Sequence, residues 1–100
     1  MPNAVFFNSY KLKKGKPTEE FLLAAETLIN EHISKQQGYI SSKILVDGET
    51  WADYAVFETM EDLENFLEQS RNPNEAAQKF YSYINLMSCT SRKFSVERSY

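Results

Sequence analysis

The sequence predicts an α+β fold in which helices cover one face of a four-stranded antiparallel sheet. Segments rich in Val, Ile, Phe and Tyr alternate with segments of helical periodicity, in the order strand, helix, strand, strand, helix, helix, strand. An Asp-Gly pair between the two middle strands is typical of a tight hairpin. The chain has 100 residues, of which 42% are hydrophobic and 25% charged, so we expect a single domain over residues 1–100.

The first strand is predicted over residues 4–12, where Val, Phe and Tyr favour extended backbone. A loop with Gly15 and Pro17 follows. We expect a helix to begin after an N-cap at Thr18 and to run to about Lys35, with Gly38 as its C-terminal stop. Apolar residues recur through this segment at helical spacing: Phe21, Ala25, Leu28, Ile29 and Ile33.

Two further strands are predicted over residues 39–46 and 51–58, paired antiparallel through a turn centred on Asp47-Gly48. Thr59 is expected to cap the next helix, which ends near Ser70 and carries an apolar stripe formed by Met60, Leu63, Phe66 and Leu67.

A third helix is predicted after an N-cap at Asn72, with Pro73 at its first position, where a missing N–H is harmless. A turn over residues 85–87 then leads to a long last strand over residues 88–98. This order is that of the ferredoxin-like split β-α-β sandwich, β-α-β-β-α-α-β.

Both faces of the predicted sheet carry large apolar side chains. Because strand residues alternate between faces, Phe6 and Phe7 lie on opposite sides, as do Ile44 and Leu45. Helices cover only one face of such a sheet, so the other face needs a second cover. We expect a homodimer in which two copies pack their sheets face to face into an α+β barrel.

Composition excludes several kinds of partner. A net charge of −3 with mixed acids and bases argues against nucleic acid, although lysines cluster around Gly15. The longest apolar run is far shorter than a membrane span, and no leader is apparent. The single Cys89 cannot close an intrachain disulfide and is interpreted as a buried hydrophobe. With one His and one Cys, no metal site is expected, and we predict a cytoplasmic protein.

Two stretches resemble a known family. "QQGYISSKIL" resembles the entry into the second strand of the antibiotic biosynthesis monooxygenase-like domains of the dimeric α+β barrel superfamily, and "GETWADYAVFETMEDLENF" resembles their third strand and the helix after it. The resemblance covers nearly the whole chain. It implies a dimer with a largely apolar cavity between helices and sheet, and an activity that oxidises polycyclic phenols without metal or flavin.

Related family members degrade haem with an Asn on the first strand, a Trp on the second helix and a His on the last helix. By position, Asn8 matches the Asn. The Trp position falls on Phe66 and the His position near residues 78–80, so neither residue is kept. The resemblance therefore implies no haem ligation through that His, and we expect no cofactor.

Two residues are the catalytic candidates. Asn8 is an amide in an apolar strand and could hold a substrate oxygen, or it could be satisfied by backbone or water. His32 falls in the first helix's stripe and could take a phenolic proton, since histidine titrates near neutral pH, or it could reach solvent at the helix end. Aromatic side chains are expected to bind the ligand: Trp51, Tyr54, Phe66, Phe80 and Tyr81.

Asp53 is a conditional candidate, because enclosure among its apolar neighbours would raise its pKa. The sequence favours a small-molecule binding domain for an apolar, aromatic ligand, with oxidation of a phenol by dioxygen as its chemistry. Two alternatives stay open, a non-catalytic dimeric ligand-binding or stress-response module and a haem-handling protein.

Overall fold

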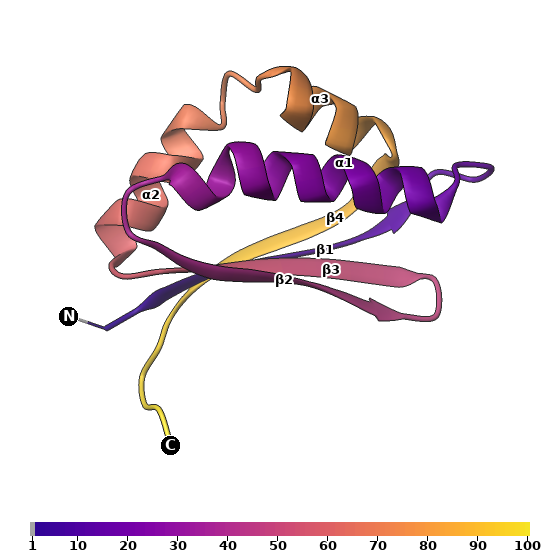
Figure 1. Ribbon diagram of the computed structural model, residues 1–100. Coiled ribbons are helices and arrows are strands. Elements are labelled where there is room, and N and C mark those ends of the chain that lie inside the picture. The colour runs from indigo at the N-terminus through magenta and orange to yellow at the C-terminus, as the bar shows by residue number, and fades with distance from the viewer. Residues whose placement is uncertain (1) are drawn as a thin grey trace.

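The computed structural model describes residues 2–100 and shows three helices on one face of a four-stranded sheet (Figure 1). The strands are β1 (Ala4–Leu12), β2 (Tyr39–Asp47), β3 (Thr50–Phe57) and β4 (Ile84–Ser95). The helices are α1 (Thr18–Glu31), α2 (Met60–Gln69) and α3 (Glu75–Ser82), and a 3₁₀ turn, η1 (Ile33–Lys35), follows α1. The predicted ferredoxin-like α+β fold is confirmed.

The sheet has the order β2-β3-β1-β4, and every neighbouring pair is antiparallel. β1 therefore lies in the interior of the sheet, between β3 and β4. Its Asn8 is directly opposite Asp53 on β3 and Ser91 on β4. Residues that are directly opposite share a face of the sheet, so this register sets three polar side chains in a row on one face.

The hairpin between β2 and β3 is confirmed, but its turn lies one residue later than predicted. Asp47 pairs with Thr50, so the turn is centred on Gly48 and Glu49. Gly48 has a φ of 61°, whereas no residue other than glycine has a positive φ in the described chain. A glycine at the first central position with an ordinary second residue is the pattern of a type II′ turn, which follows the twist of the strands.

The helix ends show where the predicted caps were right and wrong. Thr59 caps α2 as predicted, because its Oγ1 accepts a hydrogen bond from the backbone N–H of Asp62 at 3.0 Å. Thr18 is not a cap: it is the first residue of α1, after Pro17. α1 ends at Glu31, whereas the sequence predicted a helix to about Lys35. The last residues of the predicted segment form the 3₁₀ turn η1 instead.

α3 begins two residues later than predicted. Asn74, not Asn72, is its cap, and the Asn74 Oδ1 accepts from the N–H of Ala77 at 2.8 Å. The two asparagines have the same capping side chain. Asn72 comes directly before Pro73, which favours the extended backbone that an N-cap residue also needs, so this local preference pointed to the wrong asparagine. Propensity alone therefore could not identify the correct one.

β4 begins at Ile84, four residues before the predicted start, and ends at Ser95. Its pairing with β1 shifts register between Ser9 and Lys11 on β1. The turn predicted at residues 85–87 is not a separate turn, because these residues belong to β4. A local hydrogen bond is found there, in which Asn85 Oδ1 accepts from the N–H of Met87 at 3.2 Å. Ser88 Oγ also accepts from the N–H of Lys11 at 2.8 Å, which ties this irregular segment to β1.

The buried residues form two clusters between the helices and the sheet. The larger cluster lies beneath α1 and α3 around Phe21, whose ring stacks on Phe80 at 5.4 Å and meets Trp51 edge to face at 5.3 Å. The smaller cluster lies beneath α2 around Phe57 and Leu63, both fully buried. Two separate clusters leave a space between them, and that space becomes the cavity described below.

No helix of the described chain covers the second face of the sheet (Figure 1). Side chains on this face alternate with those that meet the helices, and the register groups the apolar ones in adjacent positions: Val5, Phe7, Tyr54, Val56 and Phe94. Phe94 and, on β2, Leu45 are exposed by 47% and 43%. The prediction that both faces carry apolar groups is therefore confirmed.

Two glycines with positive φ allow a matched test of this packing. Gly38 has a φ of 82°, and a Cβ there would collide with the side chain of Asp62 on α2. Gly48 has a φ of 61° in open space. Gly48→Ala should lower the free energy of unfolding by about 1 kcal/mol through backbone strain alone. Gly38→Ala should cost about 3 kcal/mol, because strain and overpacking add.

Urea denaturation of the wild type and both variants measures the two costs. Equal losses for Gly38→Ala and Gly48→Ala would contradict the close approach of Gly38 to α2.

Candidate functional site

The centre of the sheet face beneath the helices carries a polar row in otherwise apolar surroundings. Asp53, Asn8 and Ser91 lie opposite one another on β3, β1 and β4. Asn8 is only 4% exposed and is the one buried polar side chain of the described residues. Buried amides are costly unless hydrogen-bonded, so the partners of this row decide what it can do.

Each member of the row has one defined hydrogen bond. The Tyr10 hydroxyl donates to Asp53 Oδ2 at 2.7 Å. The Ser91 hydroxyl donates to Asn8 Oδ1 at 2.7 Å. The carbonyl oxygen of Asn8 is thereby occupied, while its Nδ2 makes no hydrogen bond to residues 2–100 and is not sealed in the interior. Asn8 lines the cavity, so this N–H group is free to donate to a bound molecule.

Burial raises the pKa of the Asp53 carboxyl from 3.8 to about 6, and the hydrogen bond from Tyr10 partly opposes that rise. The carboxyl is therefore mostly ionised at neutral pH yet accepts a proton more readily than an ordinary aspartate. Burial, and next the charge of Asp53, raises the pKa of Tyr10, which stays protonated as a donor. The same two causes raise the pKa of Tyr81 and of the Cys89 thiol.

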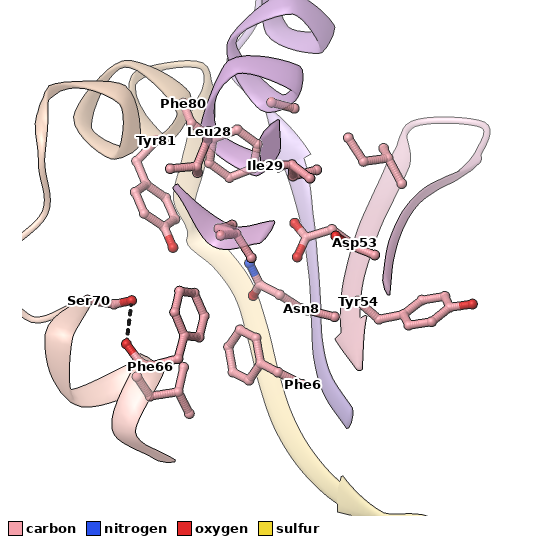
Figure 2. A pocket seen from close by; sticks show the side chains of 16 residues that line it. Phe6, Asn8, Leu28, Ile29, Asp53, Tyr54, Phe66, Ser70, Phe80 and Tyr81 are labelled. Atoms are coloured by element: carbon pink, nitrogen blue, oxygen red, sulfur yellow. Dashed lines mark hydrogen bonds between the residues drawn. The ribbon is translucent and has the colours of Figure 1, made fainter. Parts of the chain in front are cut away.

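A cavity of about 90 Å³ opens above the polar row (Figure 2). Asn8 and Asp53 form its floor, α1 contributes Leu28 and Ile29, and Phe66 and Tyr81 close one side from α2 and α3. The rest of the wall is mostly apolar: Phe6, Ala25, Ile33, Ile44, Ala55, Leu67 and Phe80. A concave, largely apolar space with a few convergent polar groups on one wall is typical of a small-molecule site.

The cavity brings together most of the residues that the sequence put forward as site candidates. Asn8, Phe66, Phe80 and Tyr81 line it. Tyr54 also borders it, but its ring projects away from the cavity (Figure 2).

Trp51 and His32 lie elsewhere. Trp51 packs against Phe21 near the lysine-rich loop. His32 follows α1 and lines a separate outer groove between the ends of the helices.

Three residues of the site were missed or given little weight in the prediction from sequence: Asp53 and Ser91 of the polar row, and Tyr10, which donates to Asp53. Asp53 was only conditional, because enclosure by three helices cannot be read from strand alternation. Tyr10 and Ser91 were not singled out at all. Tyr10 lies two positions after Asn8 on the same strand, which is a signal that alternation could have given. Ser91 lies far away in sequence, and the register between β1 and β4 was needed to align it with Asn8.

No group of three or more His, Cys, Asp or Glu that could hold a metal ion occurs in residues 2–100. Within the same range, none of the helices has the length and apolar character needed to cross a membrane.

Comparison with solved structures shows the same fold in other proteins. SnoaB, a cofactor-independent oxygenase from Streptomyces nogalater, superimposes with a TM-score of 0.78 at 13% identity, over 99% of this chain and 97% of that one. A Bacillus cereus protein provisionally described as an antibiotic biosynthesis monooxygenase gives 0.66 at 18% identity, over 100% and 98%. A dimeric protein of unknown function and ferredoxin-like fold from Bacteroides fragilis gives 0.62 at 18%, over 93% and 95%.

These likenesses confirm the predicted ferredoxin-like fold, which this chain shares with SnoaB and with the Bacillus cereus protein. No protein-family model matches the sequence, and no curated protein is significantly similar to it. The functional assignment therefore depends on the residues of the cavity.

The raised pKa of Asp53 gives a stability test. The folded protein holds this proton more tightly than the unfolded chain, so ionising Asp53 between about pH 4 and about pH 6 weakens the fold. The penalty should be absent below about pH 4 and reach about 3 kcal/mol at neutral pH. Asp53→Asn should therefore be more stable than the wild type by about this amount at about pH 7.5, with the difference vanishing near pH 4.

Urea denaturation at the two pH values, at one protein concentration, measures this difference. Asp47→Asn, in the exposed hairpin, is the matched control and should change stability little at either pH. An Asp53→Asn variant that is no more stable than the wild type at about pH 7.5 would show that the carboxyl is not desolvated.

Proposed function

We propose that the cavity binds a hydroxylated aromatic molecule and oxidises it with dioxygen, without metal or flavin. One observation carries the proposal: a partly buried carboxylate with a raised pKa lies beside a free amide N–H at the floor of a largely apolar cavity. A phenolic compound offers an acidic hydrogen for the carboxylate and an oxygen for the amide, while its ring fills the apolar space.

Asp53 acts as the general base in this proposal. It takes a proton from a CH₂ group of the substrate that is acidic because it is conjugated with the hydroxylated aromatic rings. The Asn8 N–H donates a hydrogen bond to the substrate oxygen on which the negative charge develops. The resulting carbanion gives its electrons to dioxygen and forms a carbon–oxygen bond, which yields a peroxide. Asp53 returns its proton to the peroxide, and loss of water leaves a ketone. The balance is one CH₂ group and one O₂ consumed, and one C=O group and one H₂O formed.

Asp53 is favoured over His32 as the base on geometry. Asp53 lies on the cavity floor opposite Asn8, whereas His32 lines the outer groove. A general base must come within hydrogen-bond reach of the proton it takes, and Asp53 shares the cavity with the amide that would hold the same substrate. The catalytic role of His32 stays a prediction that a variant can test.

The solved structures support an oxygenase of this kind without deciding the substrate. SnoaB is described as a cofactor-independent oxygenase, and it shares the fold of this chain over nearly its full length. A mechanism in which the substrate itself reduces dioxygen needs only desolvation, a base and an oxyanion donor. The cavity holds candidates for all three.

Oxygen consumption with a hydroxyanthrone as probe tests the function. We expect turnover to a quinone whose new oxygen comes from heavy-isotope dioxygen, as read by mass spectrometry. Asn8→Ala should lower kcat about 100-fold by removing the oxyanion donor. Asp53→Asn should lower kcat by about 100-fold or more by removing the base. Activity should rise with pH through about 6 as Asp53 ionises.

Two variants serve as controls for that assay. His32→Ala and Ser9→Ala, the latter on the opposite face of β1, should leave kcat within about twofold of wild type. Loss of activity in His32→Ala with full activity in Asp53→Asn would transfer the role of base to His32. Binding of the probe without oxygen uptake would favour the non-catalytic ligand-binding module, and a Soret band on titration with haem would favour the haem-handling alternative.

We further propose that the uncovered sheet face pairs with the same face of a second copy. The apolar side chains of this face lie in adjacent register positions, and a self-complementary patch is buried most simply by a two-fold dimer. The Bacteroides fragilis protein of the same fold is described as dimeric. Such a dimer leaves the helices, and with them the cavity, on its outer surface.

The dimer is tested by native mass spectrometry. The wild type should have twice the 11.6 kDa mass of the chain. Val56→Lys, at the centre of the uncovered face, should weaken the dimer at least about 100-fold, because an unpaired ammonium group would be buried. Leu23→Lys, at an exposed leucine of α1 on the helical side, should leave it intact. A monomeric wild type at micromolar concentration would contradict the proposal.

A further inference from the structure

An outer groove of about 260 Å³ lies between the end of α1, the end of α2 and the segment that leads into α3. It is larger than the cavity of about 90 Å³ behind it. The two spaces are neighbours: Leu28, Ile33, Phe66, Ser70 and Tyr81 line both. A ligand that reaches from the cavity into the groove would pass these shared side chains, among them Phe66 and Tyr81, which stand together on one side of the cavity (Figure 2).

The volume of the cavity indicates that it cannot hold a whole drug-sized molecule by itself. Pockets for such ligands measure about 300 Å³ or more, and a space of about 90 Å³ suits only part of a polycyclic molecule. Cavity and groove together reach that range.

The groove has an unusual chemistry for this chain. One residue in four of the sequence is Asp, Glu, Lys or Arg, yet none of these types lines the groove. Its polar residues are instead four amides, two hydroxyl-bearing residues and one histidine: Gln36, Gln69, Asn72, Asn74, Ser70, Tyr81 and His32. A charged ligand group that left water here would find no opposite charge, whereas hydroxyl and carbonyl groups would find donors and acceptors.

Several of these polar groups are free to bind. The side chains of His32, Gln69 and Asn72 make no hydrogen bond to other residues within the described chain. Asn74 uses its Oδ1 to cap α3, and its Nδ2 stays available. Gln69 and Asn72 are exposed, so their side chains can be changed without disturbing the core.

We propose that the groove is a second binding subsite, which recognises an uncharged, hydroxyl-bearing substituent on the aromatic ligand held in the cavity. The substrate class is then a hydroxylated polycyclic aromatic with a neutral polyhydroxy group, such as a sugar, attached to it. This inference rests on the proposed function for the identity of the aromatic part. The groove's own role is to select substituents by hydrogen bonding and to disfavour charged ones.

Calorimetric titration with three probes tests the subsite: a dihydroxyanthraquinone, its mono-glucoside and its mono-sulfonate. The glucoside should bind about tenfold more tightly than the parent, because two or more hydrogen bonds form in the groove. The sulfonate should bind no better than the parent. The double variant Gln69→Leu with Asn72→Ala should abolish the preference for the glucoside over the parent.

Asn30→Ala, at an exposed asparagine of α1 outside the groove, is the matched control and should keep the preference. Equal affinities for parent and glucoside, or a preference that survives the double variant, would overturn the subsite. Failure of the proposed function gives a different result: the glucoside preference persists, but the hydroxyanthrone assay shows no oxygen uptake. If the protein oxidises the hydroxyanthrone but shows no preference for the glucoside, the subsite is rejected and the proposed function is kept.

Discussion

The antiparallel register of β1 against β3 is the constraint on which the candidate site depends. It sets Asn8 opposite Asp53 and brings Tyr10 within hydrogen-bond distance of the same carboxyl. A slip of one residue would move one strand's whole set of side chains to the other face of the sheet. The apolar partners on the same strands prevent that slip, since Ala4 and Phe57 are fully buried at one end of the ladder. Packing thus positions the polar groups.

The division of the core into two clusters gives the fold its cavity. α1 and α3 bury one group of aromatic residues, α2 buries another, and the polar row lies in the gap between them. Keeping a carboxylate in that gap costs stability, because the raised pKa of Asp53 means that its charge is poorly solvated. Destabilising groups of this kind concentrate where chemistry is performed. The same layout leaves the second sheet face free for a partner copy.

Much of the fold could be predicted from sequence because it depends on local patterns. Strand alternation, helical periodicity and the Thr59 cap identified the elements and their order. The predictions were wrong where the local sequence allows two alternatives. The cap of α3 is Asn74 and not Asn72, and the hairpin turn lies one residue later than predicted. The cavity was predicted in part: Asn8, Phe66, Phe80 and Tyr81 line it. Asp53 and Ser91 required the pairing of strands far apart in sequence, which no local pattern records.

The proposed function requires Asp53 to be a desolvated carboxylate that can accept a substrate proton near neutral pH. A carbon-13 NMR titration of the aspartate carboxyl groups, assigned with the Asp53→Asn variant, measures this directly. We expect the Asp53 resonance to titrate with a pKa of about 6, well above the ordinary value of 3.8. A pKa at or below that ordinary value would show a solvated carboxylate and would contradict the proposed role of Asp53 as the base.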